Sequence, residues 1–303
     1  MVNIKTNKST VYIGHNVFDE LNVYLSSYEN SQIYILVDEN TLEHCVTDLI
    51  SSCKLLHDSE IIEINSGEEN KTLDICCQIW KTLSDFKADR SSLLINLGGG
   101  VITDMGGFIA STYKRGIDFI NIPTTLLSQI DASVGGKVGV DFEGLKNMIG
   151  VFNEPKAVFI RPEFLKTLDK RQMLSGYAEA LKHALIEDVS YWEDLKKGML
   201  FNSSDWGTLI EKSVTIKNRV VLADPTEKAK RKLLNFGHTI GHAIETNSLN
   251  KDDLPLLHGE SIALGMICES YISHNINGLN KSALDDISNT IFSFYQFKKI
   301  DSS

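Results

Sequence analysis

The first half of this sequence alternates short apolar segments with longer amphipathic ones, and the alternation ends near residue 160. Amphipathic stretches between the apolar segments predict helices, and strand–helix alternation is typical of an α/β domain built on a mostly parallel sheet. The apolar segments, rich in Val, Ile, Tyr and Phe, are predicted to be buried strands: Gln32–Val37, Ile61–Ile64, Ser92–Leu97, Phe119–Ile122 and Ala157–Ile160.

Beyond residue 160 only helical periodicity remains, with apolar residues three and four positions apart. A chain of 303 residues fits two domains of roughly 100–200 residues each. We therefore predict an α/β domain over residues 1–160 and an all-α domain over residues 161–303. The predicted helices of the second domain are Lys170–Glu187, Trp206–Leu222, Glu227–Glu245, His258–His274 and Lys281–Phe297.

Composition excludes several classes of protein. The formal net charge is −10, whereas nucleic-acid binders usually present a basic surface. The five cysteines form no C-x-x-C motif, which argues against a disulfide framework or a zinc ribbon and for a reducing cytoplasm. The N-terminus lacks the apolar core of a signal peptide, and no apolar run reaches the ~18–20 residues of a membrane helix.

Two stretches that follow predicted strands could bind a ligand. Ser66 and Glu69 have the spacing of a capping box, which by itself accounts for the polar residues Glu68 and Lys71 nearby. The run Gly98–Gly107 begins with three glycines between a strand and a helix, an arrangement that can direct backbone N–H groups at a phosphate. It lacks the G-x-G-x-x-G spacing, and a tight turn before a closely packed helix remains the alternative.

Polar residues also gather after the strand that ends near Ile122. The segments Pro123–Leu127 and Asp131–Lys137 bring hydroxyls, an acid, two glycines and a lysine close together, and Lys146 and Asn147 follow. A solvated loop would explain any one of these residues. Their position after an apolar strand favours a ligand site, because α/β proteins bind ligands at that edge of the sheet.

Three helices of the second domain carry candidate metal ligands. His238 and His242 are four residues apart and share one helix face; a buried helix with two core histidines is the alternative. Glu179 shares a face with Lys182, for which a surface ion pair is the simpler explanation, and His258 begins a helix as a ligand or as a core histidine. A carboxylate with two imidazoles is the ligand set of a catalytic zinc.

Cations are numerous around these candidates although the protein is acidic. A protein that gathers cations beside a metal is predicted to bind a small molecule with several negative groups. The cations are Lys137, Lys146, Lys182, Lys217 and Arg231.

In these segments the sequence closely resembles the 3-dehydroquinate synthases, the sugar-phosphate cyclases of the shikimate pathway. The resemblance covers about residues 32 to 275, and its motifs occur in the family's order. They are Gly67-Glu68 with Lys71, Leu97 to Asp104, Thr124 to Leu127, Asp131 to Lys137, Lys146 to Gly150, Gly176 to His183, Leu234 to Glu245, and Leu257 to Met266.

The resemblance implies a Rossmann-like NAD-binding α/β domain followed by an all-α metal-binding domain. It implies zinc or cobalt on Glu179, His242 and His258, and a homodimer in which Arg115 reaches across the interface. NAD contacts are implied for Asp38, Asn40, Gly67, Glu68, Lys71, Gly99, Gly100, Val101, Asp104, Thr124, Thr125, Lys137, Lys146, Phe164, Leu165 and Thr167. Substrate contacts or catalytic roles are implied for Arg115, Asp131, Lys137, Lys146, Asn147, Lys182, Lys217, Arg231, Asn235 and His238.

The implied reaction converts 3-deoxy-D-arabino-heptulosonate 7-phosphate to 3-dehydroquinate and phosphate. NAD accepts a hydride and later returns it, phosphate leaves by elimination, and an intramolecular aldol step closes the ring. His238, one turn from the predicted ligand His242, is expected to move protons with a substrate hydroxyl.

Two alternatives stay open. One is another enzyme of the same fold, either a related sugar-phosphate cyclase or a metal-dependent alcohol dehydrogenase. The other is a non-catalytic NAD- and metal-binding protein. It stays open because the family carries a C-terminal lysine-rich motif that Lys298 and Lys299 do not match.

Overall fold

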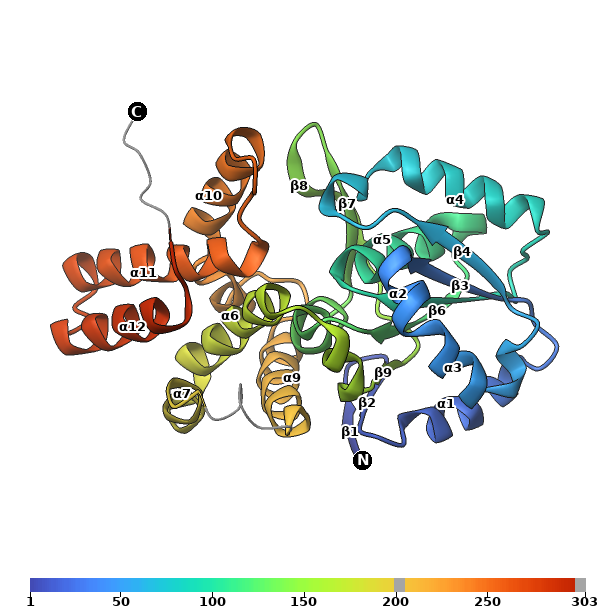
Figure 1. The fold of residues 1–303 in the computed structure, drawn as a ribbon, viewed down its shortest axis with the longest axis horizontal. Helices are drawn as coiled ribbons and strands as arrows, with labels where there is room; N and C mark the ends of the chain where they lie inside the picture. The colour runs from blue at the N-terminus through green and yellow to red at the C-terminus, as the bar shows by residue number, and fades with distance from the viewer. Residues whose placement is uncertain (199–204, 298–303) are drawn as a thin grey trace. The chain divides into compact units, whose positions relative to one another are not determined.

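The computed structural model describes residues 1–198 and 205–297 (Figure 1). Contacts divide the described chain into two compact units: residues 1–168 with 205–222 form the first, and residues 169–198 with 223–297 form the second. The domain boundary predicted from the sequence, at residue 160, lies eight residues before residue 168, where the first segment of the first unit ends. Helix α9, Trp206–Ala223, groups with the first unit, although its sequence pattern resembles that of the helices in the second.

Within the described residues, the first unit contains a seven-stranded sheet in the order β1-β2-β9-β6-β5-β3-β4. The pair β1–β2 is antiparallel, and the other pairs are parallel. The strands are β1 Val2–Lys5, β2 Thr10–Ile13, β3 Ile33–Asp38, β4 Glu60–Ile64, β5 Leu93–Gly98, β6 Asp118–Pro123 and β9 Val158–Ile160. The sheet therefore contains all five predicted strands and adds an N-terminal hairpin that the sequence analysis missed.

A second hairpin, β7 Lys137–Phe142 with β8 Leu145–Phe152, was also missed. Glycines interrupt its apolar alternation: Gly139 lies opposite Gly150, and a Cβ on Gly139 would come within 2.6 Å of the Ile149 carbonyl oxygen. The two strand backbones approach closely at these glycines. Because glycine has no side chain, the apolar alternation by which a strand is recognised in a sequence is lost there. This hairpin carries Lys137, Lys146 and Asn147, for which no strand was predicted.

Helices cover both faces of the sheet and bury two apolar clusters. Along β3 the side chains alternate: Ile35 joins the cluster with α1 and α3, and Leu36 joins the cluster with α4 and α5. This alternation accounts for the continuous apolar strands that the sequence shows. The helices are α1 Val17–Leu25, α2 Glu39–His44, α3 Val46–Ser52, α4 Leu73–Asp85 and α5 Gly100–Thr112.

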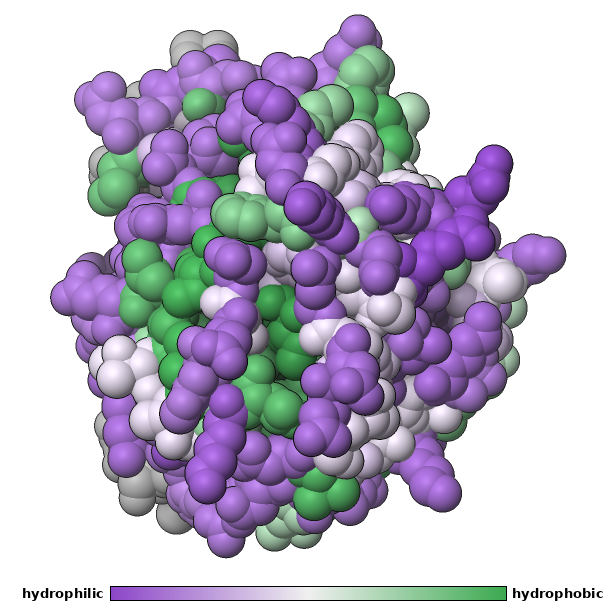
Figure 2. Space-filling model, turned by 90° about the vertical axis from the view of Figure 1, so that its right-hand side faces the viewer, coloured by the Kyte–Doolittle hydropathy of each residue, from purple (hydrophilic) through white to green (hydrophobic). Residues whose placement is uncertain are grey.

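One edge of this sheet is the short strand β4. Figure 2 looks onto the side of the molecule at the right of Figure 1, where apolar side chains gather near the middle among polar ones. On β4, Ile61 is 39% exposed, and the charged residues Glu60 and Glu63 are exposed as well. Charges on an edge strand disfavour pairing with a strand of another chain.

The second unit is helical, as predicted. Its helices are α6 Lys170–Glu187, α7 Val189–Lys196, α10 His238–Lys251, α11 His258–Ile276 and α12 Lys281–Phe294. The predicted helix Glu227–Glu245 is wrong in its first half. Gly237 has φ +80°, a left-handed conformation that begins α10 at His238, and residues Lys230–Asn235 form a short 3₁₀ helix. No helix among the described residues is long and apolar enough to cross a bilayer.

Glycines hold α10 and α11 unusually close together. A Cβ on Gly265 of α11 would lie 1.9 Å from the carbonyl oxygen of Gly237, and a Cβ on Gly241 would lie 3.0 Å from that of Ser261. At the start of α11, a Cβ on Gly259 would lie 1.9 Å from the carbonyl oxygen of Ser175 in α6. Backbone atoms, not flexible side chains, lie where these Cβ atoms would be. Helices α6, α10 and α11 therefore pack at distances that only glycine permits.

Gly265→Ala is expected to lower the free energy of unfolding by about 1–3 kcal/mol, the usual cost of overpacking a core. The new methyl must push α10 and α11 apart, because it would overlap the backbone of Gly237. Thermal unfolding of Gly207→Ala serves as the control, since a Cβ there would meet only a side-chain oxygen of Asp205 at 3.6 Å. Equal midpoints for the two variants would contradict the close packing.

Candidate active site

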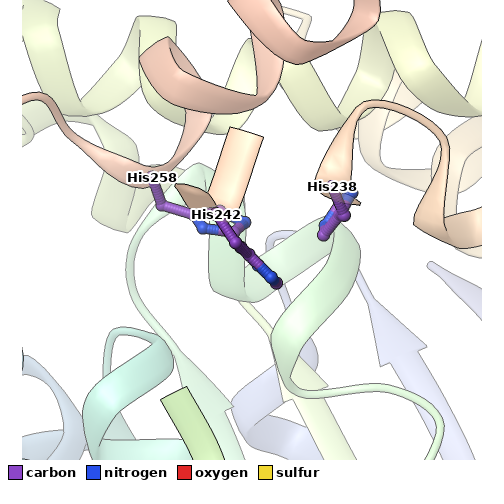
Figure 3. A group of neighbouring side chains, drawn as sticks. All are labelled: His238, His242 and His258. Carbon is purple, nitrogen blue, oxygen red and sulfur yellow. The ribbon is translucent and has the colours of Figure 1, made fainter. Parts of the chain in front are cut away.

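The second unit brings three imidazoles and one carboxylate together. His238 and His242 lie one turn apart on α10, and His258 begins α11, so that the three rings face one another (Figure 3). One ligand atom from each of the three lies within 4.8 Å of the others. Glu179, on α6, has Oε1 at 3.6 Å from His238 Nε2 and at 3.7 Å from His258 Nε2.

These separations fit a divalent metal. Two ligand atoms bound at about 2.1 Å to a tetrahedral zinc lie about 3.4 Å apart. The Glu179 side chain is fully buried, and a buried carboxylate requires a compensating charge. Lys182, one turn later on α6, forms an ion pair with Glu179 and is itself 1% exposed. The donor set of one carboxylate and two imidazoles is therefore suited to zinc or cobalt.

The distances make His238 a candidate for the second imidazole of that set. Glu179 Oε1 lies between the Nε2 atoms of His238 and His258. His242 contributes the third ring, with its centroid 5.2 Å from that of His238 and 5.7 Å from that of His258. The sequence analysis predicted His242 as the ligand and His238 as the residue that moves protons, and all three imidazoles of this cluster lie close enough together to bind a metal. Two histidines on one helix face cannot be told apart by spacing alone.

The ionisation of the two rings beside Glu179 differs. Burial, together with the charge of Lys182, lowers the pKa of His238 to about 3, so its ring is neutral and able to bind a metal at neutral pH. Burial also lowers the pKa of His258, but hydrogen bonding to Glu179 and Glu245 outweighs that effect and raises it to about 9. In the metal-free protein His258 therefore holds a proton that an incoming metal must displace.

Zinc affinity of the metal-free protein is expected to rise with pH up to about 9, because the His258 proton competes with the metal. Below that value the affinity should fall by up to about tenfold per pH unit, with one proton released for each ion bound. Titration against a chromophoric chelator between pH 6.5 and 9 measures the slope. An affinity that does not change over this range would show that His258 is not a ligand.

Other predicted substrate residues of the second unit lie close to the histidines in sequence. Arg231 is 3% exposed and donates from Nη1 to the carbonyl oxygen of Pro225 at 2.9 Å. Asn235 donates from Nδ2 to Glu227 Oε1 at 2.9 Å. Both belong to the turn before α10, which Asp224 organises by accepting hydrogen bonds from the backbone N–H groups of three following residues.

In the first unit, predicted cofactor residues from three segments form one polar cluster, together with Asn147, a predicted substrate contact. Lys71 Nζ lies 2.7 Å from both Asp104 Oδ2 and Asn147 Oδ1, and Lys146 Nζ lies 3.3 Å from Glu68 Oε1. Lys71 is 3% exposed. Burial lowers its pKa, but the charges of Asp104 and Glu68 outweigh this, so the net shift is upward and the ammonium stays charged.

The glycine turn follows β5 and begins α5 as predicted, with Gly99 at the N-cap. Packing explains two of its glycines: a Cβ on Gly98 would overlap Ile102 at 2.5 Å, and one on Gly99 would come within 3.1 Å of Thr125. Three glycines in a row are therefore weaker evidence for a phosphate site than the sequence suggested. A Cβ on Gly100 would make an ordinary contact with Ala132, at 3.4 Å. Val101 follows within α5 and is partly buried.

The remaining predicted cofactor residues differ in their surroundings. Asp38 caps α2, accepting from the backbone N–H of Thr41, and Asn40 is exposed in that helix. Thr124 and Thr125 follow β6, and Thr167 ends the 3₁₀ helix Pro162–Thr167. Phe164 and Leu165 are at most 5% exposed.

The predicted capping box at Ser66 is wrong. Helix α4 begins seven residues later, at Leu73, and its N-cap is Thr72. Ser66 instead donates from its backbone N–H to Glu39 Oε2 at 2.7 Å. Gly67 has φ +108°, so the chain turns sharply before Glu68. Glu68 and Lys71 therefore do not cap α4, and they belong instead to the polar cluster with Asp104 and Lys146.

The first unit also contains four of the residues predicted to contact substrate: Arg115, Asp131, Lys137 and Lys217. Lys217 Nζ lies 2.8 Å from Asp131 Oδ1, which joins α9 to the segment after β6. Lys137 is the exposed first residue of β7. Arg115 is exposed and has φ +70° in the turn before β6. Lys298 and Lys299 lie outside the described residues.

Sequence reasoning missed two carboxylates that support the histidines. Glu269 of α11 accepts hydrogen bonds from the backbone N–H groups of Gly237, at 2.8 Å, and Ile240, at 3.4 Å, and so caps the helix that carries His238. Glu245 lies 3.3 Å from His258 Nδ1. Glu245 could have been recognised, because it follows His238 by seven residues on the same face of α10.

Comparison with known proteins places the whole arrangement in a family. Residues 61–175 match the pattern described as 3-dehydroquinate synthase N-terminal, and residues 176–300 match 3-dehydroquinate synthase C-terminal. The 3-dehydroquinate synthase of Parabacteroides distasonis is 45% identical over 290 residues, which are 94% of this chain and 81% of that protein.

Two solved structures share the fold. A 2-deoxy-scyllo-inosose synthase complexed with carbaglucose-6-phosphate, NAD+ and Co2+ has a TM-score of 0.86 and 26% identity, covering 96% of this chain and 82% of that one. A 2-epi-5-epi-valiolone synthase from Streptomyces hygroscopicus with NAD+ and Zn2+ bound has a TM-score of 0.84 and 26% identity, covering 97% and 82%. These matches confirm the predicted fold class and the predicted resemblance: the chain belongs to the 3-dehydroquinate synthase family.

Proposed function

We propose that this chain converts 3-deoxy-D-arabino-heptulosonate 7-phosphate to 3-dehydroquinate and inorganic phosphate. The observation that carries the proposal is the buried Glu179 carboxylate between the Nε2 atoms of His238 and His258, in a unit that matches the C-terminal half of the family. When bound, NAD supplies a reversible hydride acceptor, and zinc or cobalt supplies a Lewis acid.

Glu179, His238 and His258 would hold the metal, and His242 is the third imidazole of the cluster. His242 would then move a proton to or from a substrate hydroxyl, since it stands one turn from a ligand without being needed as one. Lys182, paired with Glu179, offsets the charge of that carboxylate and offers a donor to a substrate oxygen. Arg231 and Asn235 lie on the turn that leads into α10 and would contact the substrate's anionic groups.

In the first unit, Glu68, Lys71, Asp104 and Lys146 would bind the dinucleotide together with the turn at Gly99 and Gly100. The mutual pairing of these charges keeps them ordered and close together. Asp131, Lys137, Asn147 and Lys217 would bind the sugar phosphate. The high density of cations supports an anionic substrate, because a simple alcohol would need none of them.

Phosphate release tests the reaction directly. With the heptulosonate phosphate, NAD and zinc, the protein is expected to release one phosphate per substrate without accumulating NADH, because the hydride returns to the same substrate. Net NADH formation from a simple alcohol would instead establish a dehydrogenase. Binding of NAD and zinc without phosphate release would identify a non-catalytic protein.

A homodimer in a reducing cytoplasm completes the proposal. Arg115 is exposed on a turn with positive φ, where it can extend away from its own unit. The role of Arg115 is tested by sedimentation equilibrium and phosphate release, measured for the parent and for Arg115→Ala. The parent is expected to be dimeric, and the variant is expected to remain dimeric but lose turnover. A monomeric parent would refute the dimer.

A further inference from the structure

The buried carboxylate of Glu245, which has no role in the proposed reaction, lies beside Nδ1 of His258. Glu245 lies two turns after His238 on α10, and its side chain is 4% exposed. Its Oε2 lies 3.3 Å from His258 Nδ1, while His258 Nε2 lies 3.7 Å from Glu179 Oε1. The imidazole is therefore held between two carboxylates from two different helices, one at each ring nitrogen.

This arrangement fixes the direction in which His258 can bind a metal. A neutral imidazole carries one proton, so a carboxylate that accepts the Nδ1 proton leaves the lone pair on Nε2. Nε2 is the nitrogen that faces Glu179 and, through it, His238. A hydrogen-bonded carboxylate at the outer nitrogen also makes the ring a stronger ligand.

Glu245 is poorly placed to be a ligand itself. Its Oε2 lies beside Nδ1 of His258, whereas Nε2 of the same ring faces Glu179 and the other donors. Its charge still matters for the site: Glu245 and Glu179 supply two negative charges, and Lys182 offsets one of them through its ion pair with Glu179. Burying an additional carboxylate is costly unless a cation or a hydrogen-bond donor compensates it.

We propose that Glu245 is a positioning residue that orients His258 through Nδ1 and thereby sets the metal affinity of the site. The inference rests on the proposed metal site and adds to it a residue that does not touch metal, NAD or substrate. Carboxylates in this outer position typically change metal affinity by about 10–100-fold when they are removed.

Zinc dissociation constants of the metal-free full chain test this role, measured by competition with a chromophoric chelator at one pH. Glu245→Ala is expected to weaken zinc binding by about 10–100-fold. Glu245→Gln keeps an acceptor oxygen but loses the charge, so its affinity is expected to lie between those of the parent and the alanine variant. The visible absorption of the cobalt-substituted protein should change in the same order, because it reports ligand geometry.

Asp286→Asn is the matched control. Asp286 is a carboxylate of the same unit that accepts from Trp192 Nε1 at 2.8 Å and from Lys196 Nζ at 2.9 Å. Its loss should lower the midpoint of thermal unfolding without changing zinc affinity. A merely structural Glu245 would behave in the same way, and that result would overturn the inference. The glutamine variant decides the question if the alanine variant does not fold.

The outcome also separates this inference from the proposed function. If the parent binds zinc and both Glu245 variants bind it equally well, only the positioning role is refuted. If the parent itself does not bind zinc, the proposed metal site fails, and the role of Glu245 fails with it.

Discussion

His238→Ala is expected to abolish tight zinc binding, whereas His242→Ala is expected to retain the metal and lose turnover. Glu179 Oε1 lies 3.6 Å from His238 Nε2 and 3.7 Å from His258 Nε2, and the proposed metal site therefore uses His238 as its second imidazole. Loss of a direct ligand should weaken binding by more than about 100-fold, since loss of an outer-shell partner alone costs 10–100-fold. Metal analysis after dialysis measures the difference.

In His242→Ala the rate of phosphate release should fall by about 10²–10⁴-fold, the usual contribution of a general acid or base. NAD affinity should be unchanged in both variants, which serves as the control for folding of the first unit. The opposite metal contents, with zinc lost from His242→Ala and kept by His238→Ala, would restore the assignment that the sequence suggested.

Lys71→Met is expected to lower the free energy of unfolding by about 3–5 kcal/mol, the cost of leaving one member of a buried ion pair without its partner. Lys71 Nζ lies 2.7 Å from Asp104 Oδ2, and its side chain is 4% exposed. Burial raises the pKa of Asp104, and Lys71 opposes that effect. Denaturant unfolding of parent and variant at several pH values measures the loss.

The loss of stability in Lys71→Met should depend on pH, because Lys71 affects the pKa of Asp104. Without Lys71 the pKa of Asp104 rises further, so the folded variant must hold a charged carboxylate at a cost at neutral pH. The destabilisation should therefore be largest at neutral pH and shrink as the pH falls and Asp104 takes up a proton. The double variant Lys71→Met with Asp104→Leu should recover stability but not NAD binding. A double variant as unstable as Lys71→Met would contradict the buried pair.

The architecture could be predicted from sequence because local patterns encode it. The five predicted strands and four of the predicted helices occur close to their predicted positions, since an apolar strand or an amphipathic helix is recognisable within ten to twenty residues. The two hairpins and the true start of α10 were missed. In those places Gly139, Gly150 and Gly237 act through backbone approach or left-handed conformation, which apolar periodicity does not report.

The amino-acid sequence by itself determined the α/β and all-α halves, the family, and the set of residues from which the site is drawn. Tertiary structure alone brought His238 within 3.6 Å of Glu179 and showed which carboxylate supports His258. It also grouped α9 with the first unit. The physical reason is that periodicity gives the helix face on which a side chain lies. Pairings between helices depend on how closely their backbones pack, and here glycines at 237, 241, 259 and 265 set that distance.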